Sequence, residues 1–265
     1  MISEDLIWYA AYGSNLSEER FLYYINGGTP VGTTRNYTPC NDIIPPRETR
    51  PYELNFELFF ARHADSWSGG IAFIDNVQDN EINTLAKLYL ISKTQFNHLA
   101  KQETQTPGLV NIDFKEAENE GRTVFKRPSW YGLVLFLGHV ENIPVFTLTE
   151  ERTIESFTKP SEKYLMTIAS GLRQTHNLSN DEIFHYFSKL KGVGEYYKFF
   201  ELYDVVNGRI NHAAEYMRII LDDYAKEYSR MPEGELKSQK KIDMENLMRQ
   251  YYGEIRIDYL GEAFN

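Results

Sequence analysis

The stretch that decides the fold is WYAAYGSNL, residues Trp8 to Leu16. It belongs to an apolar and aromatic run, Leu6 to Tyr12, which is typical of a strand covered on both faces. The run ends at Gly13-Ser14-Asn15, three residues that fill no core. Ser17 and the two glutamates after it are typical of a helix N-cap, and Asn26-Gly27-Gly28 is typical of a helix end. We therefore predict a strand, a tight turn and a helix.

A glycine-containing turn of this kind has two interpretations. Between a strand and a helix, successive backbone N–H groups form a concavity that suits a carboxylate, a phosphate or a developing oxyanion. The alternative is an ordinary tight turn, in which Gly13 has a positive φ and Ser14 or Asn15 caps the next helix. Local chemistry leaves both interpretations open.

A second feature is a carboxylate on the apolar side of a helix. Ser92 and Gln95 have the spacing of a capping box, so a helix is expected from residue 93 to about Glu103. Its apolar stripe reaches Glu103, seven residues beyond Phe96. A carboxylate aimed at the core is what a general acid/base needs. A glutamate that turns outward at the helix end, or that pairs with a basic residue, fits the same pattern.

The rest of the chain falls into two parts. Residues 29–51 are rich in Pro, Gly, Thr and Asn, which indicates a long irregular connection close to the site. Strands and helices then alternate to about residue 177, with strands expected over residues 52–60, 68–75, 85–91, 130–138 and 143–149 and a helix after Pro160-Ser161. From residue 180 onward only helical patterns follow, notably over residues 210–228 and 235–252. We therefore expect a core domain, residues 1–178, and a C-terminal helical extension, residues 179–265.

Composition limits the partners and the location. Hydrophobic residues make up 42% of the chain, which supports a sizeable core, and the net charge of -10 argues against nucleic acid and anionic membranes as partners. The single cysteine, Cys40, excludes an internal disulfide, and the six scattered histidines offer no metal-ligand spacing, so no metal site is expected. The N-terminal apolar run follows acidic residues and is about half of the ~20 residues of a membrane span. A cytoplasmic protein is expected.

Four separated blocks resemble one family. They are YGSNL at residues 12–16, SWSGGIAFI at residues 66–74, LYLISKTQFNHLAKQE at residues 88–103 and PSEKYLMTIASGL at residues 160–172. In content and in order these blocks resemble the γ-glutamylcyclotransferase-like superfamily, which includes the AIG2-like proteins. The resemblance covers roughly residues 6–176 and does not account for residues 180–265.

The resemblance implies a fold and an activity. The fold is α+β, with a small, mixed, mostly antiparallel, barrel-like sheet flanked by helices. The activity is a cofactor-free, amide-cleaving acyl transfer, in which the α-amine of a γ-glutamyl amine or amino acid attacks its own γ-carbonyl and leaves 5-oxoproline and a free amine. By position Glu103 corresponds to the acid/base of the family. The loop of Tyr12, Gly13, Ser14, Asn15 and Leu16 would bind the glutamyl group, with Tyr164 as a further contact.

One departure from the family and two rival functions complete the expectations. Family members commonly carry Gly directly after the catalytic Glu and a Tyr a few residues later, whereas here Thr104 and Gln105 follow, so a reshaped pocket edge is expected. The first rival is γ-glutamyl transfer or hydrolysis by an external nucleophile. The second is a non-catalytic module that binds a small acidic ligand and contacts a partner protein through the C-terminal helices. A homo-oligomer formed through those helices is also expected.

Overall fold

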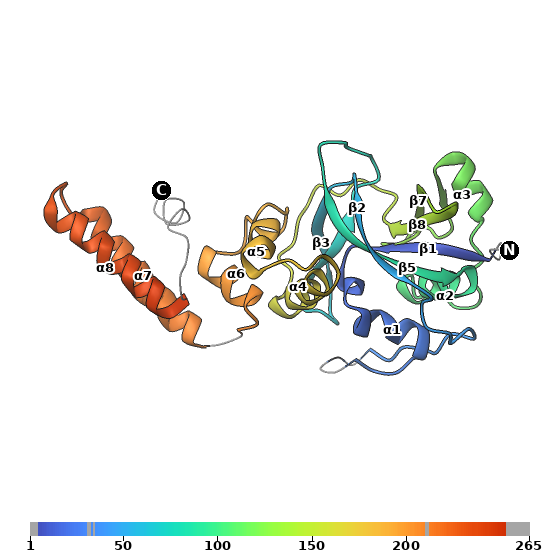
Figure 1. Cartoon of the computed structure of the whole chain (residues 1–265), viewed down its shortest axis with the longest axis horizontal. Helices are drawn as coiled ribbons and strands as arrows, with labels where there is room; N and C mark the ends of the chain where they lie inside the picture. The colour runs from blue at the N-terminus through green and yellow to red at the C-terminus, as the bar shows by residue number, and fades with distance from the viewer. Residues whose placement is uncertain (1–4, 31–32, 34, 210–211, 253–265) are drawn as a thin grey trace. The chain divides into compact units, whose positions relative to one another are not determined.

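The computed structural model describes residues 5–30, 33, 35–209 and 212–252, and it has the expected α+β architecture (Figure 1). The described strands form a six-stranded sheet in the order β2-β5-β1-β8-β7-β6 and a separate two-stranded ribbon, β3-β4. All the strand pairs are antiparallel except β1 with β8. Helices flank the sheet, as predicted, but these strands do not close into a barrel, because β2 and β6 remain as edges.

The chain divides into two compact units, Met1–Tyr197 and Lys198–Asn265. Helix α5, Asn180–Ser188, belongs to the first unit, whereas the domain boundary expected from the sequence precedes it. The first unit contains every strand of the two sheets. Its elements are β1 (Leu6–Ala11), η1 (Ser14–Leu16), α1 (Glu18–Asn26), β2 (Thr49–Leu54), β3 (Leu58–Ala64), β4 (Gly69–Ile74), β5 (Thr84–Ser92), α2 (Lys93–Glu103), α3 (Phe114–Glu120), β6 (Arg122–Val124), β7 (Leu133–Val140), β8 (Ile143–Thr149), α4 (Glu162–His176) and α5.

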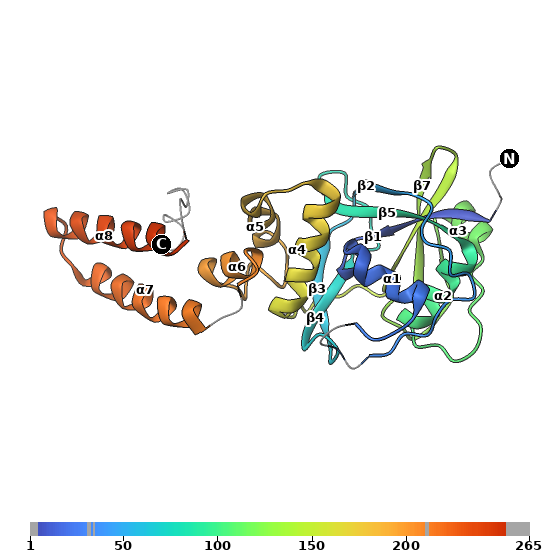
Figure 2. The same cartoon turned by 60° about the horizontal axis from the view of Figure 1, so that its bottom comes forward.

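The opening stretch is the central strand of the larger sheet. Strand β1 lies between β5 and β8, and its residues from Ile7 to Ala11 are buried, as expected for a strand covered on both faces. The rings of Tyr9, Phe21 and Tyr89 stack beside it, with centroids 4.0 Å apart for Phe21 and Tyr89. Helices α1 and α2 lie close together on this side of the sheet (Figure 2). The aromatic core therefore fixes the end of β1, where the turn begins.

The predicted helices of the first unit are confirmed. Helix α2 starts at the capping box of Ser92 and Gln95 and ends at Glu103. Helix α4 is capped by Ser161 and ends before Asn177, whose φ of 53° is left-handed. The face of α4 that meets the core carries the apolar residues at 3.6-residue spacing. They are Leu165, Ile168, Ala169 and Leu172, all with no exposed surface.

The single strand predicted over residues 52–60 is wrong. The chain leaves the larger sheet after Leu54 and joins the ribbon at Leu58, and the carbonyl groups of Asn55, Phe56 and Glu57 accept hydrogen bonds from residues of the connection between β4 and β5 or from the start of β5. Apolar and polar residues keep alternating through the crossing, so the period of two hides it. The one local signal is Asn55, a residue depleted in strands.

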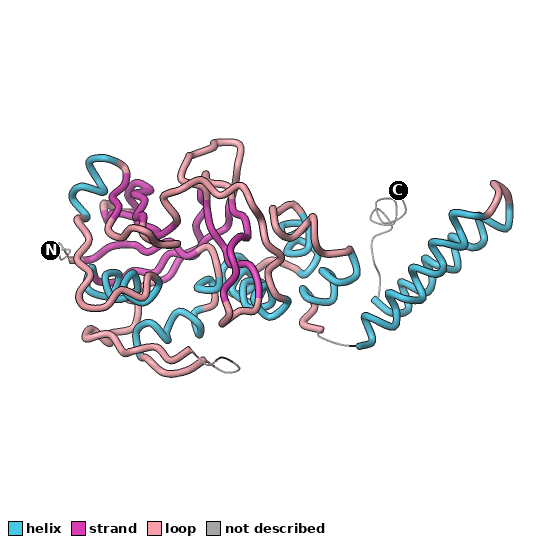
Figure 3. The backbone as a smooth tube through the Cα atoms, turned by 180° about the vertical axis from the view of Figure 1, so that it is seen from behind, coloured by secondary structure: helices cyan, strands magenta, loops and turns pink. Residues whose placement is uncertain are grey.

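The second unit is helical in its described part. It contains α6 (Phe199–Val206), α7 (His212–Arg230) and α8 (Glu235–Tyr252), and α7 and α8 run side by side as a hairpin (Figure 3). Leu221 and Met244 are buried, and Lys240 Nζ lies 2.6 Å from Glu227 Oε2. The helix predicted over 235–252 is confirmed, and that over 210–228 is confirmed from residue 212, because residues 210 and 211 lie outside the described residues. Among the helices described, none has the length and apolar composition of a membrane span.

Candidate functional site

A cavity of about 320 Å³ in the first unit brings most of the predicted site residues together. Tyr12, Gly13, Ser14 and Asn15 line it from the turn after β1, and Glu103 lines it from the end of α2. Tyr164, on the first turns of α4, also lines it. Leu16 is not among the lining residues. Residues more than 150 positions apart in the chain thus share one chamber.

The turn after β1 is not the ordinary tight turn considered as an alternative. The φ of Gly13 is -110°, not the positive value that the alternative requires. The 3-10 helix η1 follows, and the backbone N–H of Leu16 donates to the Gly13 carbonyl at 2.9 Å. The cap of α1 is Ser17, whose hydroxyl accepts from the backbone N–H of Arg20. Glycine at position 13 leaves room for its neighbours, because a Cβ there would lie 3.1 Å from the Tyr164 hydroxyl oxygen and from Ala72 Cβ, and these side chains would have to shift slightly.

Leu16 and Tyr12 hold the turn in place. Leu16 is buried and lies very close to Gly171 of α4. A Cβ added to Gly171 would lie only 2.4 Å from the carbonyl carbon of Leu16. Tyr12 donates from its hydroxyl to the Leu148 carbonyl at 2.6 Å, which ties the start of the turn to β8. Leu16 therefore supports the turn from behind, while the three residues before it face the cavity.

Glu103 lies where the apolar stripe of α2 predicts it, at the cavity wall. The preceding stripe residues Phe96, Leu99 and Ala100 have no exposed surface, whereas Glu103 is partly buried. The Tyr24 hydroxyl donates a hydrogen bond to Glu103 Oε1. Burial, and secondarily the Glu103 carboxylate, raise the pKa of Tyr24 well above its usual value, so this phenol keeps its proton at neutral pH. Glu103 is therefore a carboxylate held by a neutral donor.

The residues that follow Glu103 form one edge of the cavity. Gln105 lines the cavity and has a left-handed backbone, with φ 48°. Thr104 is the C-cap residue of α2, and its hydroxyl donates to the Ala100 carbonyl at 2.8 Å. An amide side chain therefore stands at the edge of the cavity two residues beyond the carboxylate.

Aromatic side chains make up much of the remaining wall. The ring of Trp67 lies 4.7 Å from that of Tyr164, and Tyr131 stacks on Phe73 at 5.0 Å. Burial raises the pKa of Tyr164 to about 12, although hydrogen bonds with the backbone of Ala72 and Ser14 act in the opposite direction. Burial likewise raises the pKa of Tyr131, so both phenols are neutral hydrogen-bonding groups in the aromatic part of the wall.

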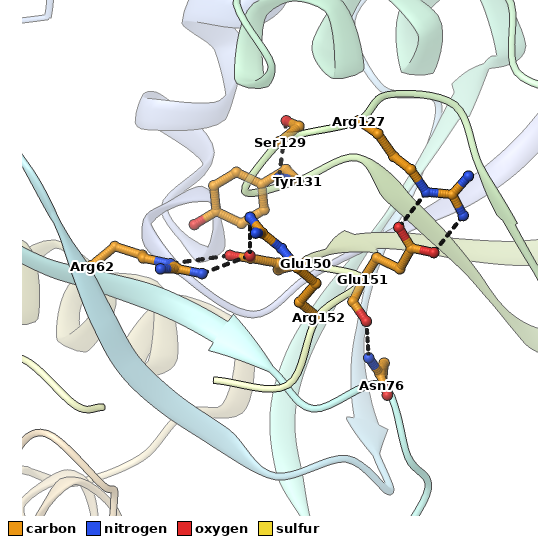
Figure 4. Close-up of polar contacts among 8 residues, drawn as sticks. All are labelled: Arg62, Asn76, Arg127, Ser129, Tyr131, Glu150, Glu151 and Arg152. Atoms are coloured by element: carbon orange, nitrogen blue, oxygen red, sulfur yellow. Dashed lines mark hydrogen bonds and ion pairs between the residues drawn. The ribbon is translucent and has the colours of Figure 1, made fainter. Parts of the chain in front are cut away.

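A buried carboxylate secures the ribbon beside the cavity (Figure 4). Glu150, which follows β8, accepts from Arg62 at 3.1 Å and 2.6 Å, and Arg152 Nη2 lies 3.2 Å from it. The Glu150 side chain is 2% exposed, whereas those of Arg62 and Arg152 are 34% and 65% exposed. Arg62 directly precedes His63 and Ala64 in β3, and both of these residues line the cavity. The pair with Arg62 thus fixes β3 against the end of β8.

The next residue secures another part of the wall. Glu151 pairs with Arg127, whose Nε lies 2.5 Å from Oε2, and its carbonyl accepts from Asn76 Nδ2 at 2.6 Å (Figure 4). Arg127 precedes the two wall residues Trp130 and Tyr131 by a few positions. The loop between β6 and β7 is thereby tied to the end of β8.

Sequence reasoning missed two cations and one donor in this cavity, Arg20, Arg35 and Tyr24. Arg20 and Tyr24 lie four residues apart on the buried side of α1, so a charged residue on an apolar helical stripe, the signal that identified Glu103, was present there too. Arg35 lies in the connection predicted to be irregular and close to the site, where no periodicity marks a single residue.

Potential metal ligands do not cluster in the described part of the chain. Within those ranges His, Cys, Asp and Glu side chains form no group of three that could hold a metal ion.

Comparisons with known proteins give partial matches. No protein-family profile matches the chain. It is 32% identical over 201 residues to a protein named Histone deacetylase 5 from Arabidopsis thaliana, and the match covers 69% of this chain and 30% of that protein. The chain thus spans less than a third of the length of this relative.

Two solved structures are also similar. One is named gamma-glutamyl cyclotransferase, with a TM-score of 0.42, 17% identity and coverage of 77% of this chain and 99% of that chain. The other is an uncharacterized protein from Homo sapiens, with a TM-score of 0.41, 18% identity and coverage of 81% and 98%.

Proposed function

We propose that this protein is a γ-glutamyl cyclotransferase with Glu103 as its general acid/base. The observation that carries the proposal is that Glu103 lines the same cavity as Gly13, Ser14 and Asn15, with Tyr24 holding its carboxylate. A carboxylate in the same cavity as the backbone of this turn would supply the two functions that amide cleavage needs, proton transfer from Glu103 and stabilisation of an oxyanion by backbone N–H groups.

The reaction proceeds by intramolecular attack. The α-amine of the γ-glutamyl group forms a bond to its own γ-carbonyl carbon, and the carbonyl oxygen gains negative charge beside the turn. Glu103 takes a proton from the attacking nitrogen and gives one to the nitrogen of the leaving amine. The carbonyl then re-forms as the bond between this carbonyl carbon and the leaving nitrogen breaks, which yields 5-oxoproline and a free amine with no net gain or loss of protons.

The cavity contributes mainly by restricting the substrate. Its volume of about 320 Å³ holds a small molecule, and its aromatic wall and Tyr12–Asn15 edge limit how an acyl chain can lie. A γ-glutamyl chain that is held curled has its amine next to its carbonyl, and effective molarities of order 10⁵ M or more are known for such intramolecular reactions. Tyr24 serves as a positioning residue, because it touches Glu103.

Product identity from a panel of γ-glutamyl amino acids and γ-glutamyl amines tests this function. The full chain is incubated with each compound, and 5-oxoproline, glutamate and released amine are measured together. Cyclisation gives 5-oxoproline and amine in equal amounts. Glutamate in place of 5-oxoproline means hydrolysis, and a γ-glutamyl adduct of an added amine means transfer. Binding without turnover of any member identifies a binding module, and each of these three results contradicts the proposal.

A further inference from the structure

Arg20 is a buried cation with unused hydrogen-bonding capacity at the candidate site. Its side chain lines the cavity, and the residue is 7% exposed. The guanidinium carbon lies 4.5 Å from the ring centroid of Tyr37 and 5.3 Å from that of Tyr24, and Nη2 donates to the Tyr37 hydroxyl. The Nε and Nη1 atoms have no hydrogen-bond partner in the described structure. The rings hold the cation in place, and two of its nitrogens are left for another group.

Asn15, which lines the same cavity, has an unused acceptor. The residue is 6% exposed, its Nδ2 donates to the Tyr9 hydroxyl at 3.2 Å, and its carbonyl accepts from Tyr89 at 2.8 Å. Its Oδ1 atom has no partner in the described structure. The unsatisfied group of this side chain is therefore a hydrogen-bond acceptor.

Unpaired buried groups of this kind are costly. A buried donor or acceptor without a partner costs about 1–3 kcal/mol, and more when it is charged, so such groups usually have a partner in the functional state. Arg20 supplies positive charge and N–H donors, while Asn15 supplies a neutral acceptor. The chemical group that satisfies both is an α-amino-acid head, with a carboxylate for the guanidinium and an amine for the amide oxygen.

We propose that Arg20 binds the α-carboxylate of the substrate, while Asn15 Oδ1 accepts a hydrogen bond from its α-amine. The inference rests on the proposed function for the identity of the acyl group and makes Arg20 the residue that determines its specificity. The substrate class is then restricted to acyl compounds with a free α-carboxylate. The α-amides of γ-glutamyl compounds and the 4-aminobutyryl amides, which lack this carboxylate, are excluded as good substrates.

Ligand binding tests the assignment without any turnover. L-5-oxoproline and 2-pyrrolidinone share a ring and differ in the carboxylate, so their dissociation constants for the full chain isolate its contribution. A charge-assisted hydrogen bond contributes about 1.5–3 kcal/mol, so 5-oxoproline is expected to bind about 10- to 100-fold more tightly than 2-pyrrolidinone. In Arg20→Met the preference is expected to fall to about threefold or less. Arg20→Gln, which removes the charge and keeps an amide, serves as the second variant if Arg20→Met does not fold.

Arg35→Met is the matched control. It removes another cation from the same cavity wall, one that donates to the Gln102 carbonyl at 2.6 Å. It is expected to keep the preference for 5-oxoproline. If both arginine variants lose the preference equally, the general positive charge of the cavity attracts the carboxylate. This result overturns the assignment of Arg20 to the α-carboxylate. No preference in the wild type, or an unchanged preference in a folded Arg20 variant, also overturns it.

Turnover separates this inference from the proposed function. The values of kcat/KM are compared for γ-glutamyl-alanine and 4-aminobutyryl-alanine, which release the same amine and differ in the α-carboxylate. Selectivity that disappears in the Arg20 variants supports both proposals, and selectivity that persists in them contradicts only the role of Arg20. Carboxylate-dependent binding with no turnover supports the role of Arg20 and contradicts the cyclotransferase.

Discussion

Gly171→Ala tests how closely helix α4 and the turn after β1 depend on one another. In the structure the added Cβ would lie 2.4 Å from the carbonyl carbon of Leu16, 2.5 Å from its Cβ and 2.6 Å from the nitrogen of Ser17. Ordinary contacts begin at 3.4 Å, so the added Cβ and the carbonyl carbon of Leu16 have to move apart by about 1 Å. The atoms in the way are mostly backbone, so no side chain can simply rotate aside. The turn that lines the cavity therefore has to move.

The expected cost follows from two opposing effects. Alanine improves helix propensity over glycine by about 1 kcal/mol, while overpacking of a core costs about 1–3 kcal/mol. The difference is a net loss of about 0–2 kcal/mol, and because the clash is mostly with backbone we expect the upper half of this range. This loss lowers Tm by several degrees, at about 2–4 °C per kcal/mol for a chain of this size. A displacement of about 1 Å at the site can cost 10²-fold in rate, so kcat/KM for a γ-glutamyl substrate is also expected to fall by about 10- to 100-fold.

Thermal unfolding followed by circular dichroism and a 5-oxoproline assay measure the two effects. Ser170→Ala, on the same helix, is the control, because it adds no atom, and it is expected to change neither quantity much. A Gly171→Ala protein that is as stable as the wild type and fully active would refute the argument. It would mean that α4 does not hold the turn in place.

Three further results are expected. Tyr24→Phe removes the hydrogen-bond donor to Glu103, and a hydrogen bond to a charged group contributes about 1.5–3 kcal/mol. We therefore expect kcat to fall about 10- to 100-fold with little change in KM. A variant with the wild-type kcat would contradict the positioning role of Tyr24. Arg62→Met removes the bidentate partner of the buried Glu150 carboxylate, and urea titrations are expected to show a loss of about 1–3 kcal/mol in the free energy of unfolding. The loss expected for Arg152→Met, at a more exposed arginine, is about 0–1 kcal/mol. A larger loss for Arg152→Met than for Arg62→Met would contradict the role given to the Arg62 pair. Burial lowers the pKa of His176 below its ordinary value of 6.5, so the unfolded chain takes up a proton at higher pH than the folded chain, and stability is expected to fall as pH drops below about 6.5. His176→Gln should flatten that part of the pH profile of Tm, and an unchanged profile would contradict this assignment.

The sequence predicts the order and most of the elements of the first unit because their signals are local. The apolar run of β1, the capping box at Ser92 and the apolar stripe of α4 each reflect burial or capping within one element. The crossing near Asn55 escapes prediction, because it depends on which sheet each strand joins, and both strands alternate in the same way. The closed or open state of the larger sheet likewise depends on pairing between distant edges.

The candidate site is predictable to a similar extent. The helical stripe of α2 predicts the position of Glu103, and the contrast with the strand before it predicts the turn after β1. That both line one cavity depends on the packing of α1 and α2 against the sheet, which no local pattern contains. The two unpaired nitrogens of Arg20 become visible only when all its neighbours are placed.

The most direct test of the central claim is the rate of 5-oxoproline formation by Glu103→Gln on the best γ-glutamyl substrate of the panel. Loss of a general acid/base is expected to lower this rate by about 10²-fold or more, while Tm stays close to that of the wild type. Glu120→Gln, an exposed position on α3, is the control and is expected to keep the wild-type rate. Equal rates for Glu103→Gln and the wild type would contradict the proposed function of this carboxylate.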